Sequence, residues 1–261
     1  MISIEQLTFA YPPSDGIPGH IVFRGFDLTF GAQRITVVVG PSGCGKTTLL
    51  HLLAGLLPPQ TGQVIFRDAT IGEKLGFVFH APSLLPWRTV LGNVLLGAEI
   101  RGLRSEHVVA RAKALLQAYS LEALADSYPA ALSAGMKQRV ALIRALVSGA
   151  RLLLLDEPLV NVDPPLRRRL EQDLSRAVDA QGITAILVTH DIETAVRLGD
   201  DIVVLGGTPT TVIEKLSVPI ARSIRLDNPA PWPEQLVPIT QRIWMSLNEP
   251  SAPAPRSGHG R

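Results

Sequence analysis

The sequence predicts an α/β fold in which a mostly parallel central sheet is flanked by helices. Three short runs, residues 35–39, 152–155 and 185–188, are apolar almost throughout. Because they lack the alternation of a half-exposed strand, we expect strands that are buried on both faces between layers of helices. Each run ends where polar residues begin abruptly. Ligands of open α/β sheets bind beyond the carboxyl ends of the strands, so these polar residues mark the edge at which chemistry is expected.

The length and composition fit one large α/β domain or a domain with an appendage. The chain has 261 residues, of which 46% are hydrophobic, enough to bury a sizeable core. Its apolar runs have the length of strands, whereas a membrane-spanning helix needs about 18 consecutive apolar residues. The formal net charge of +2 is too small and dispersed for a nucleic-acid footprint, and the basic run 167–169 is expected on a solvated helix face. A single cysteine and an amino terminus without secretory features favour a reducing cytoplasm.

The strongest single motif follows the first of these runs. It has the spacing of a P-loop, in which small residues let backbone N–H groups curl round phosphates at the start of a helix, here expected over 47–54. Lys46 is expected to reach the β- and γ-phosphates, the Thr47 hydroxyl to bind Mg²⁺, and Thr48 to join the nucleotide contacts. Cys44 is expected to fill space in the loop and to have no redox role. The motif is Gly40-Pro41-Ser42-Gly43-Cys44-Gly45-Lys46-Thr47.

A second motif, Asp156-Glu157, stands where the run 152–155 ends. An apolar strand that ends in Asp is the Walker B arrangement, which places a carboxylate against the phosphate-bound Mg²⁺. Glu157 could then orient and polarise the attacking water as a general base. Capping of the strand end is the structural alternative for such a pair. The P-loop upstream favours the catalytic interpretation.

The third motif, Thr189-His190-Asp191, follows the run 185–188. A lone histidine is more often structural than catalytic. At the same sheet edge as the P-loop, however, His190 could donate a hydrogen bond to the γ-phosphate. The three motifs together predict a P-loop nucleoside triphosphatase.

Between about residues 87 and 150 the periodicity becomes helical, and Ser105 is the predicted N-cap of one helix. We expect a helical subdomain inserted into the sheet domain. Near its end, residues 132–139 read Leu-Ser-Ala-Gly-Met-Lys-Gln-Arg. This segment resembles the signature motif of ATP-binding cassette (ABC) proteins, usually Leu-Ser-Gly-Gly-Gln, which lies just upstream of Walker B. The chain therefore resembles the ATPases of ABC transporters over about residues 1–215.

The resemblance implies an ATPase that uses ATP and Mg²⁺ and adds an antiparallel β part at its N-terminus. Tyr11 stands where an aromatic ring stacks on adenine, and His190 takes the place of the switch histidine. The segment Asn161-Val162-Asp163 occupies the position of the D-loop. Asp163 is therefore counted among the nucleotide-binding residues.

In this family the signature loop of one subunit caps the nucleotide that the P-loop of another subunit holds. Ser133 offers a hydroxyl, and Gly135 offers an N–H at the start of a helix whose dipole favours a phosphate. These two residues are therefore expected to bind the nucleotide of a partner, in a homodimer or a heterodimer.

Residues 80–88 resemble a segment found in importers of nitrate, taurine and other alkanesulfonates. Such importers imply separate permease subunits, an extracytoplasmic solute-binding protein, and a peripheral ATPase at the cytoplasmic face of the membrane. Residues 222–247 resemble the short C-terminal extension of these members, although a purely packing helix is the alternative. The expected division is a cassette over 1–215, an extension over 216–248 and a disordered tail rich in Pro, Ser and Gly over 249–261.

Three departures from the family pattern stand out. His80 replaces a Gln that contacts Mg²⁺ and the attacking water, and imidazole cannot be both donor and acceptor from the same arm. Protonation of His80 in acid would set a cation near Mg²⁺ and suppress turnover. Ala134 replaces the first Gly of the signature, which would cost about 1 kcal/mol if that position had positive φ or touched phosphate. Val160 and Asn161 replace the Ser-Ala that is usual in the D-loop.

Two functions follow from these features. The first is a motor ATPase that drives import, with His80, Lys46, Glu157 and His190 as its catalytic residues and Thr47, Asp156 and His80 around the metal. The second is a nucleotide-binding but weakly hydrolytic regulatory or structural subunit, which the departures would suit. Soluble ABC ATPases of DNA repair or translation usually carry coiled-coil arms or paired cassettes, for which this length leaves no room.

Overall fold

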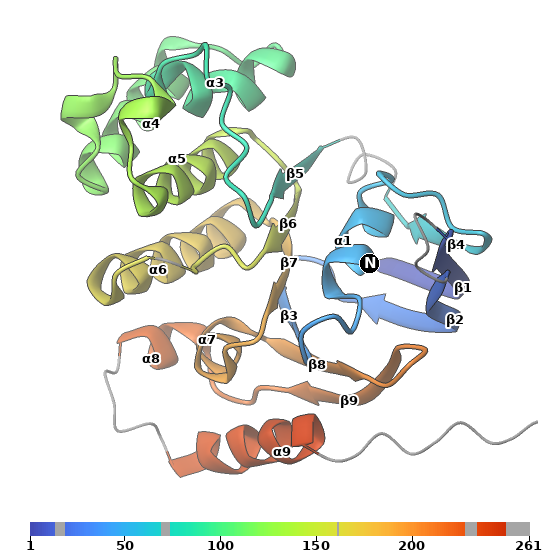
Figure 1. Ribbon diagram of the computed structural model, residues 1–261. Helices are drawn as coiled ribbons and strands as arrows, with labels where there is room; N and C mark the ends of the chain where they lie inside the picture. The colour runs from blue at the N-terminus through green and yellow to red at the C-terminus, as the bar shows by residue number, and fades with distance from the viewer. Residues whose placement is uncertain (14–18, 69–73, 161, 228–233, 249–261) are drawn as a thin grey trace, which may run out of the picture.

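The computed structural model describes residues 1–13, 19–68, 74–160, 162–227 and 234–248. A six-stranded sheet in the order β5-β6-β7-β3-β8-β9 forms its centre, and a three-stranded sheet in the order β2-β1-β4 lies beside it (Figure 1). All neighbours in the central sheet are parallel except β9, which is antiparallel to β8. The predicted α/β fold with a mostly parallel sheet is therefore confirmed. Its strands are β5 (Leu75–Val78), β6 (Leu152–Asp156), β7 (Thr184–Thr189), β3 (Ile35–Val39), β8 (Asp201–Gly206) and β9 (Thr211–Ser217).

The central strands are buried on both faces because each face packs against a hydrophobic core of its own. Along β3, Val37 and Val39 point into one core and Val38 into the other, and β6 and β7 alternate in the same way. Period-two alternation between two apolar layers explains why these runs are apolar almost throughout. The first core is formed with the helices of the middle and the C-terminal part, and the second with α1 (Lys46–Leu53) and the three-stranded sheet.

The expected antiparallel β part at the N-terminus is present. The long strands β1 (Ile2–Tyr11) and β2 (His20–Phe30) pair with each other, and β1 also pairs with β4 (Thr61–Phe66). Phe9, Phe23 and Phe30 are buried in the second core. This small sheet therefore backs the side of the central sheet on which α1 lies.

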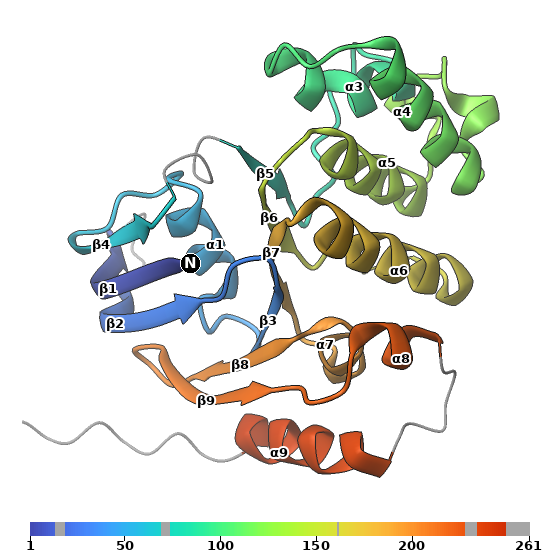
Figure 2. The same cartoon turned by 180° about the vertical axis from the view of Figure 1, so that it is seen from behind.

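The chain between β5 and β6 is helical. The principal helices are α3 (Val90–Ile100), α4 (Glu106–Ala118) and α5 (Ala134–Val147), and two 3₁₀ turns, Glu122–Leu124 and Pro129–Ala131, connect α4 to α5. The Ser105 hydroxyl accepts the Val108 N–H at 3.3 Å, which confirms the predicted N-cap of α4. Both views show this helical group at one end of the molecule, away from the three-stranded sheet (Figure 2).

The C-terminal part folds back on the central sheet. Strand β9 ends at Ser217, two residues beyond the expected cassette boundary at 215. Helices α8 (Arg222–Asp227) and α9 (Val237–Asn248) pack on α7 (Ile192–Leu198), and α9 also contacts β8 and β9. The expected tail over 249–261 lies outside the described residues. Among the helices of the described residues, none is long and apolar enough to cross a membrane.

Candidate nucleotide-binding site

The three sequence motifs meet at one edge of the central sheet because their strands are parallel neighbours. Val39, the last residue of β3, pairs in register with Thr189 of β7, and Asp156 of β6 pairs with Val188. The P-loop, the Asp156-Glu157 pair and His190 therefore leave the sheet side by side. This is the edge at which ligands of open α/β sheets bind.

The P-loop is a tight turn between β3 and α1. Gly40 is held so closely that a Cβ atom there would lie 2.7 Å from both the Cys44 Sγ atom and the Leu205 carbonyl oxygen. Cys44 is buried, as a space-filling residue should be. The rim of the loop, Pro41 to Gly43, is exposed. The loop therefore closes against the protein on one side and opens to solvent on the other.

Lys46 and Thr47 begin α1 and turn back toward the loop and the sheet. The buried Lys46 ammonium donates to the carbonyl oxygens of Gly40 at 2.7 Å and Pro41 at 3.0 Å. The Thr47 hydroxyl donates to Asp156 Oδ1 at 3.2 Å. A cation held only by two neutral carbonyls would gain stronger, charge-assisted hydrogen bonds from a phosphate.

Asp156 carries a buried carboxylate, and burial makes its charged form unfavourable. Burial raises its pKa above the ordinary range, although the Thr47 hydroxyl and the charge of the nearby His80 act in the opposite direction. Buried carboxylates in proteins are commonly paired with a cation or coordinate a metal. The described residues contain no cluster of three or more His, Cys, Asp or Glu side chains that could hold a metal alone. A divalent cation at Thr47 and Asp156 would thus need the phosphate oxygens of a nucleotide, the arrangement that Mg²⁺ favours.

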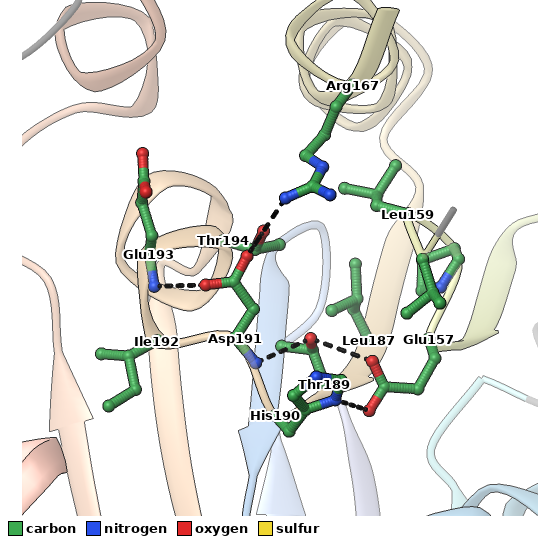
Figure 3. A pocket seen from close by; sticks show the side chains of 12 residues that line it. Glu157, Leu159, Arg167, Leu187, Thr189, His190, Asp191, Ile192, Glu193 and Thr194 are labelled. Atoms are coloured by element: carbon green, nitrogen blue, oxygen red, sulfur yellow. Dashed lines mark hydrogen bonds and ion pairs between the residues drawn. The ribbon is translucent and has the colours of Figure 1, made fainter. Parts of the chain in front are cut away.

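Glu157 is fixed by three contacts at the end of β6. Its N–H donates to the Val188 carbonyl at 3.1 Å, its Oε1 lies 2.8 Å from His190 Nδ1, and its Oε2 accepts from the Thr189 hydroxyl at 3.2 Å (Figure 3). The backbone of Glu157 has a positive φ of 48°. Such strain in a residue with a side chain persists where the surroundings impose it, often at functional sites.

Next to Glu157 lies an open cleft of about 570 Å³, between the ends of β6 and β7 and the helices that follow them. Arg167 of α6 (Pro164–Gln181) reaches across it to the Asp191 carboxylate at 3.6 Å (Figure 3). Asp191 caps α7 by accepting the Glu193 N–H at 2.9 Å. The expectation of a solvated basic face is wrong for Arg167, which is half-buried, while Arg168 and Arg169 are exposed.

Tyr11 ends β1 beside the P-loop helix. Its hydroxyl lies 3.1 Å from the Thr48 hydroxyl, and its ring packs edge-on against Phe9 with the ring centroids 5.0 Å apart. The side chain remains 40% exposed, so one part of the ring is open to a ligand. Tyr11 and Thr48, far apart in sequence, thus lie together at the site.

Residues 23–160 match the ABC transporter family. The chain belongs to this family. It is 44% identical over 209 residues to the aliphatic sulfonates import ATP-binding protein SsuB of Rhodopseudomonas palustris (strain BisA53). The aligned region covers 75% of this chain and 73% of that protein. The chain is 37% identical over 220 residues to the taurine import ATP-binding protein TauB of Escherichia coli O157:H7, which covers 83% of this chain and 85% of that protein.

Solved ABC cassettes share the fold. One such structure is the dimeric, post-hydrolysis state of the ATP-binding cassette MJ0796 bound to ADP and Pi. One of its chains matches this chain with a TM-score of 0.73 at 29% identity, and the match covers 84% of this chain and 99% of that chain. An ATP-binding subunit of an ABC transporter reaches a TM-score of 0.77 over 95% of this chain and 99% of that chain, at 23% identity. The chain is therefore an ABC ATPase that drives transport, and the weakly hydrolytic alternative is not favoured.

The ABC signature segment lies apart from the P-loop of its own chain. It opens α5, which packs with α3 and α4 in the helical group, whereas α1 lies beside the three-stranded sheet (Figure 1). Ser133 is exposed and caps α5 by accepting the Met136 N–H at 3.3 Å, and Gly135 lies in the first turn. The predicted residues of one nucleotide site thus occupy two separate faces of this ABC subunit.

The residues that depart from the ABC pattern lie in different parts of the structure. Ala134 is the first residue of α5 and is not among the residues with positive φ, so that condition for a cost is not met in this chain. The other condition, close approach to phosphate, stays a prediction. His80 follows β5, is exposed and acts electrostatically on Asp156. In the D-loop, Val160 and Asp163 are described, and Asp163 begins α6 as an exposed N-cap, while Asn161 lies outside the described residues.

Proposed function

We propose that this chain is the ATPase subunit of an importer for small sulfonates, such as taurine or an aliphatic sulfonate, or for a related anion such as nitrate. The observation that carries the proposal is the hydrogen-bonded unit of Glu157, Thr189 and His190 beside Lys46, Thr47 and Asp156. The names of the relatives, SsuB for aliphatic sulfonates and TauB for taurine, support the substrate class.

In this proposal the P-loop holds ATP with Mg²⁺. Residues 40–48 surround the phosphates, Lys46 leaves its two carbonyl partners for the β- and γ-phosphates, and Tyr11 stacks its exposed ring on the adenine. Thr47 and Asp156 would hold the Mg²⁺, and His80, which acts electrostatically on Asp156, would assist them. When bound, Mg²⁺ neutralises charge that develops on the phosphates during transfer. The raised pKa of Asp156 supports this assignment, because a cation would relieve the cost of burying its charge.

We further propose that Glu157 orients the attacking water and that His190 contacts the γ-phosphate. A carboxylate oxygen only accepts hydrogen bonds, so Nδ1 carries the proton in the 2.8 Å contact between His190 and an ionised Glu157. The Nε2 atom of a neutral ring is then an acceptor and cannot donate to a phosphate. His190 can donate to the γ-phosphate only as imidazolium, or through Nδ1 after it releases Glu157. Release would also free the Glu157 carboxylate for the water.

The second face completes the site of a partner subunit. Ser133 and Gly135 at the start of α5 cap the nucleotide held by the P-loop of the other chain, and Asp163 lies at the same interface. The exposure of Ser133 and the helix N-terminus support this role, because both leave donors free for an incoming phosphate. The dimer of MJ0796 bound to ADP and Pi supports a paired cassette. The partner would be either an identical or a different ABC subunit.

A groove beside the helical group is suited to a segment of the membrane permease. It is lined by β5, Phe79, Leu85 and Ile100, and Ile100 is 77% exposed. Arg144 of α5 crosses under it and donates to the carbonyl oxygens of Ser83 and Pro82 at 3.0 and 3.1 Å. A permease segment there would contact the residues that follow His80 and, through α5, the signature. This would hold the subunit peripherally at the cytoplasmic face, with the solute-binding protein acting only through the permease.

The proposed division of the chain assigns 1–215 to the cassette and 216–248 to a C-terminal extension. Buried Arg222 and Arg225 of α8 support a fixed extension, because both contact Asp200 between α7 and β8. Arg225 also donates to the Gly199 carbonyl at 2.8 Å. Removal of α8 and α9 would therefore expose a polar cluster and would not simply detach an appendage.

The test is solute uptake by cells that express the chain with a candidate permease and solute-binding protein from the same organism. Radiolabelled taurine, an aliphatic sulfonate and nitrate are each supplied to cells with the parent or with Glu157→Gln, and Glu106→Gln serves as an exposed control. We expect sulfonate uptake that disappears only in Glu157→Gln. Uptake that continues in this variant would contradict the motor role. Uptake confined to nitrate would contradict the sulfonate assignment.

A further inference from the structure

The turn between β8 and β9 reaches behind the P-loop. Thr210 in this turn is only 4% exposed, although its side chain is polar. Its N–H donates to the Val22 carbonyl of β2 at 2.7 Å, and it forms an isolated β-bridge with Phe23. The turn is thus hydrogen-bonded to the three-stranded sheet at the point where that sheet meets α1.

The Thr210 hydroxyl forms a hydrogen bond to the P-loop. It donates to the Cys44 carbonyl oxygen at 2.5 Å, across 166 positions of sequence. The same hairpin contributes the Leu205 carbonyl, against which Gly40 packs. The P-loop therefore rests on β8 and its turn at both of its ends.

The geometry of one peptide unit makes this contact consequential. The Cys44 carbonyl and the Gly45 N–H belong to the same planar trans unit, so they point in opposite directions. When Thr210 holds the carbonyl behind the loop, the Gly45 N–H turns toward the open side. Backbone N–H groups on that side are what a P-loop offers to phosphate.

Gly45 is packed closely against β2 and Thr210. Gly45 has a φ of 94°, and a Cβ atom there would lie 2.4 Å from Val22 Cγ1, 3.3 Å from Phe23 Cζ and 3.4 Å from Thr210 Oγ1. Glycine at positive φ has many accessible conformations, so a flexible loop would need a fixed partner to stay in one. Thr210 supplies the hydrogen bond that selects among them.

We propose that Thr210 is a positioning residue for nucleotide binding, which fixes the Cys44–Gly45 peptide so that its N–H faces the phosphates. The inference rests on the proposed nucleotide site at the P-loop. Thr210 itself lies outside residues 23–160, the part that matches the family. The substrate group it serves is the polyphosphate of the nucleotide, not the base or the cargo.

The test compares Thr210→Val, which keeps the shape but loses the hydroxyl, with Thr210→Ser, which keeps the hydroxyl. Thr211→Val is the matched control, because the exposed Thr211 hydroxyl also donates to a carbonyl of the turn, that of Gly206 at 3.3 Å. The Kd of a fluorescent ATP analogue, the KM and kcat for ATP, and the melting temperature are measured for each. Thr210→Ala against Thr210→Ser gives the same comparison if the valine variant does not fold.

We expect Thr210→Val to raise Kd and KM about tenfold, as loss of one good hydrogen bond would, with kcat at saturation within about twofold of the parent. Thr210→Ser and Thr211→Val should bind within about twofold of the parent. Unchanged affinity in Thr210→Val, or equal losses in the valine and serine variants, would overturn the inference. A parent chain that fails to bind the analogue would instead overturn the proposed nucleotide site.

Discussion

The P-loop edge and the signature segment of this chain differ in how completely they are built. At the P-loop edge, Thr47, Asp156, Glu157 and His190 come from three segments and contact one another directly or through a shared strand end. At the signature, the Ser133 hydroxyl is engaged only in capping its own helix, so far as the described contacts go. The first region thus gathers several predicted site residues in direct contact, whereas the second presents its predicted residues on another face of the chain.

Under the proposed function, this difference separates nucleotide binding from hydrolysis. In the proposed site a single chain holds the nucleotide at its P-loop edge, where the predicted phosphate-binding loop, the predicted metal-binding pair and Glu157 lie together. Stabilisation of charge at the γ-phosphate needs donors from a second direction, which the same chain presents on another face. Changes at the two regions should therefore affect binding and turnover differently.

The largest effect is expected from Glu157→Gln. An amide cannot polarise water as a carboxylate does, and general-base catalysis contributes about 100- to 10,000-fold. We expect kcat to fall by about 1,000-fold while the Kd for ATP stays within about twofold of the parent. Single-turnover hydrolysis beside an equilibrium titration measures both. A variant that retains a tenth of the parent rate would contradict the role of Glu157.

A large effect on turnover alone is expected from Gly135→Asp. The new carboxylate would stand in the first turn of α5, where the γ-phosphate of the partner's nucleotide is expected, and like charges repel. We expect turnover to fall by about 100-fold with unchanged ATP binding to the isolated chain. Ala110→Asp, at an exposed position of α4, is the control for the charge itself. Weaker binding to the isolated chain would show that Gly135 acts within its own subunit.

A smaller effect is expected at Arg167, which joins α6 to the loop that carries His190. Arg167→Met keeps much of the apolar stem but releases Asp191, so the His190 loop should become less well positioned. We expect kcat to fall about fivefold with KM unchanged, since a misplaced catalytic group costs rate rather than binding. Arg168→Met, one residue along on the exposed face, should match the parent in the same steady-state assay. Equal kcat values in the two variants would contradict a role of Arg167 in positioning the His190 loop.

The smallest effect concerns the reactivity of Cys44, the single cysteine of the chain. Burial raises the pKa of its thiol, although the neighbouring Lys46 opposes the shift. A raised pKa means a smaller thiolate fraction at any given pH, so alkylation should be slow at pH 8 and accelerate only at higher pH than for free cysteine. Mass spectrometry of iodoacetamide labelling follows the rate. Labelling as fast as that of the unfolded chain at pH 8 would contradict the buried P-loop.

The sequence predicts the parts of the site that depend on local pattern. Asp156 and His190 follow apolar runs that predict buried strands, and parallel strands bring their ends together. The contact of Thr210 with Cys44 joins segments far apart in sequence, and the same holds for that of Arg167 with Asp191. No local pattern reports either pairing. The sequence also left the backbone conformation of Ala134 open; the helix begins there, and its φ is not positive.

The central claim is that hydrolysis needs two chains whereas binding needs one. Its most direct test is steady-state ATP turnover per chain over a wide concentration series, with the association state followed by light scattering in the same samples. We predict turnover per chain that rises steeply with concentration as dimers form, and ATP binding to the monomer that does not change. Turnover per chain that stays constant while the protein remains monomeric would contradict the account.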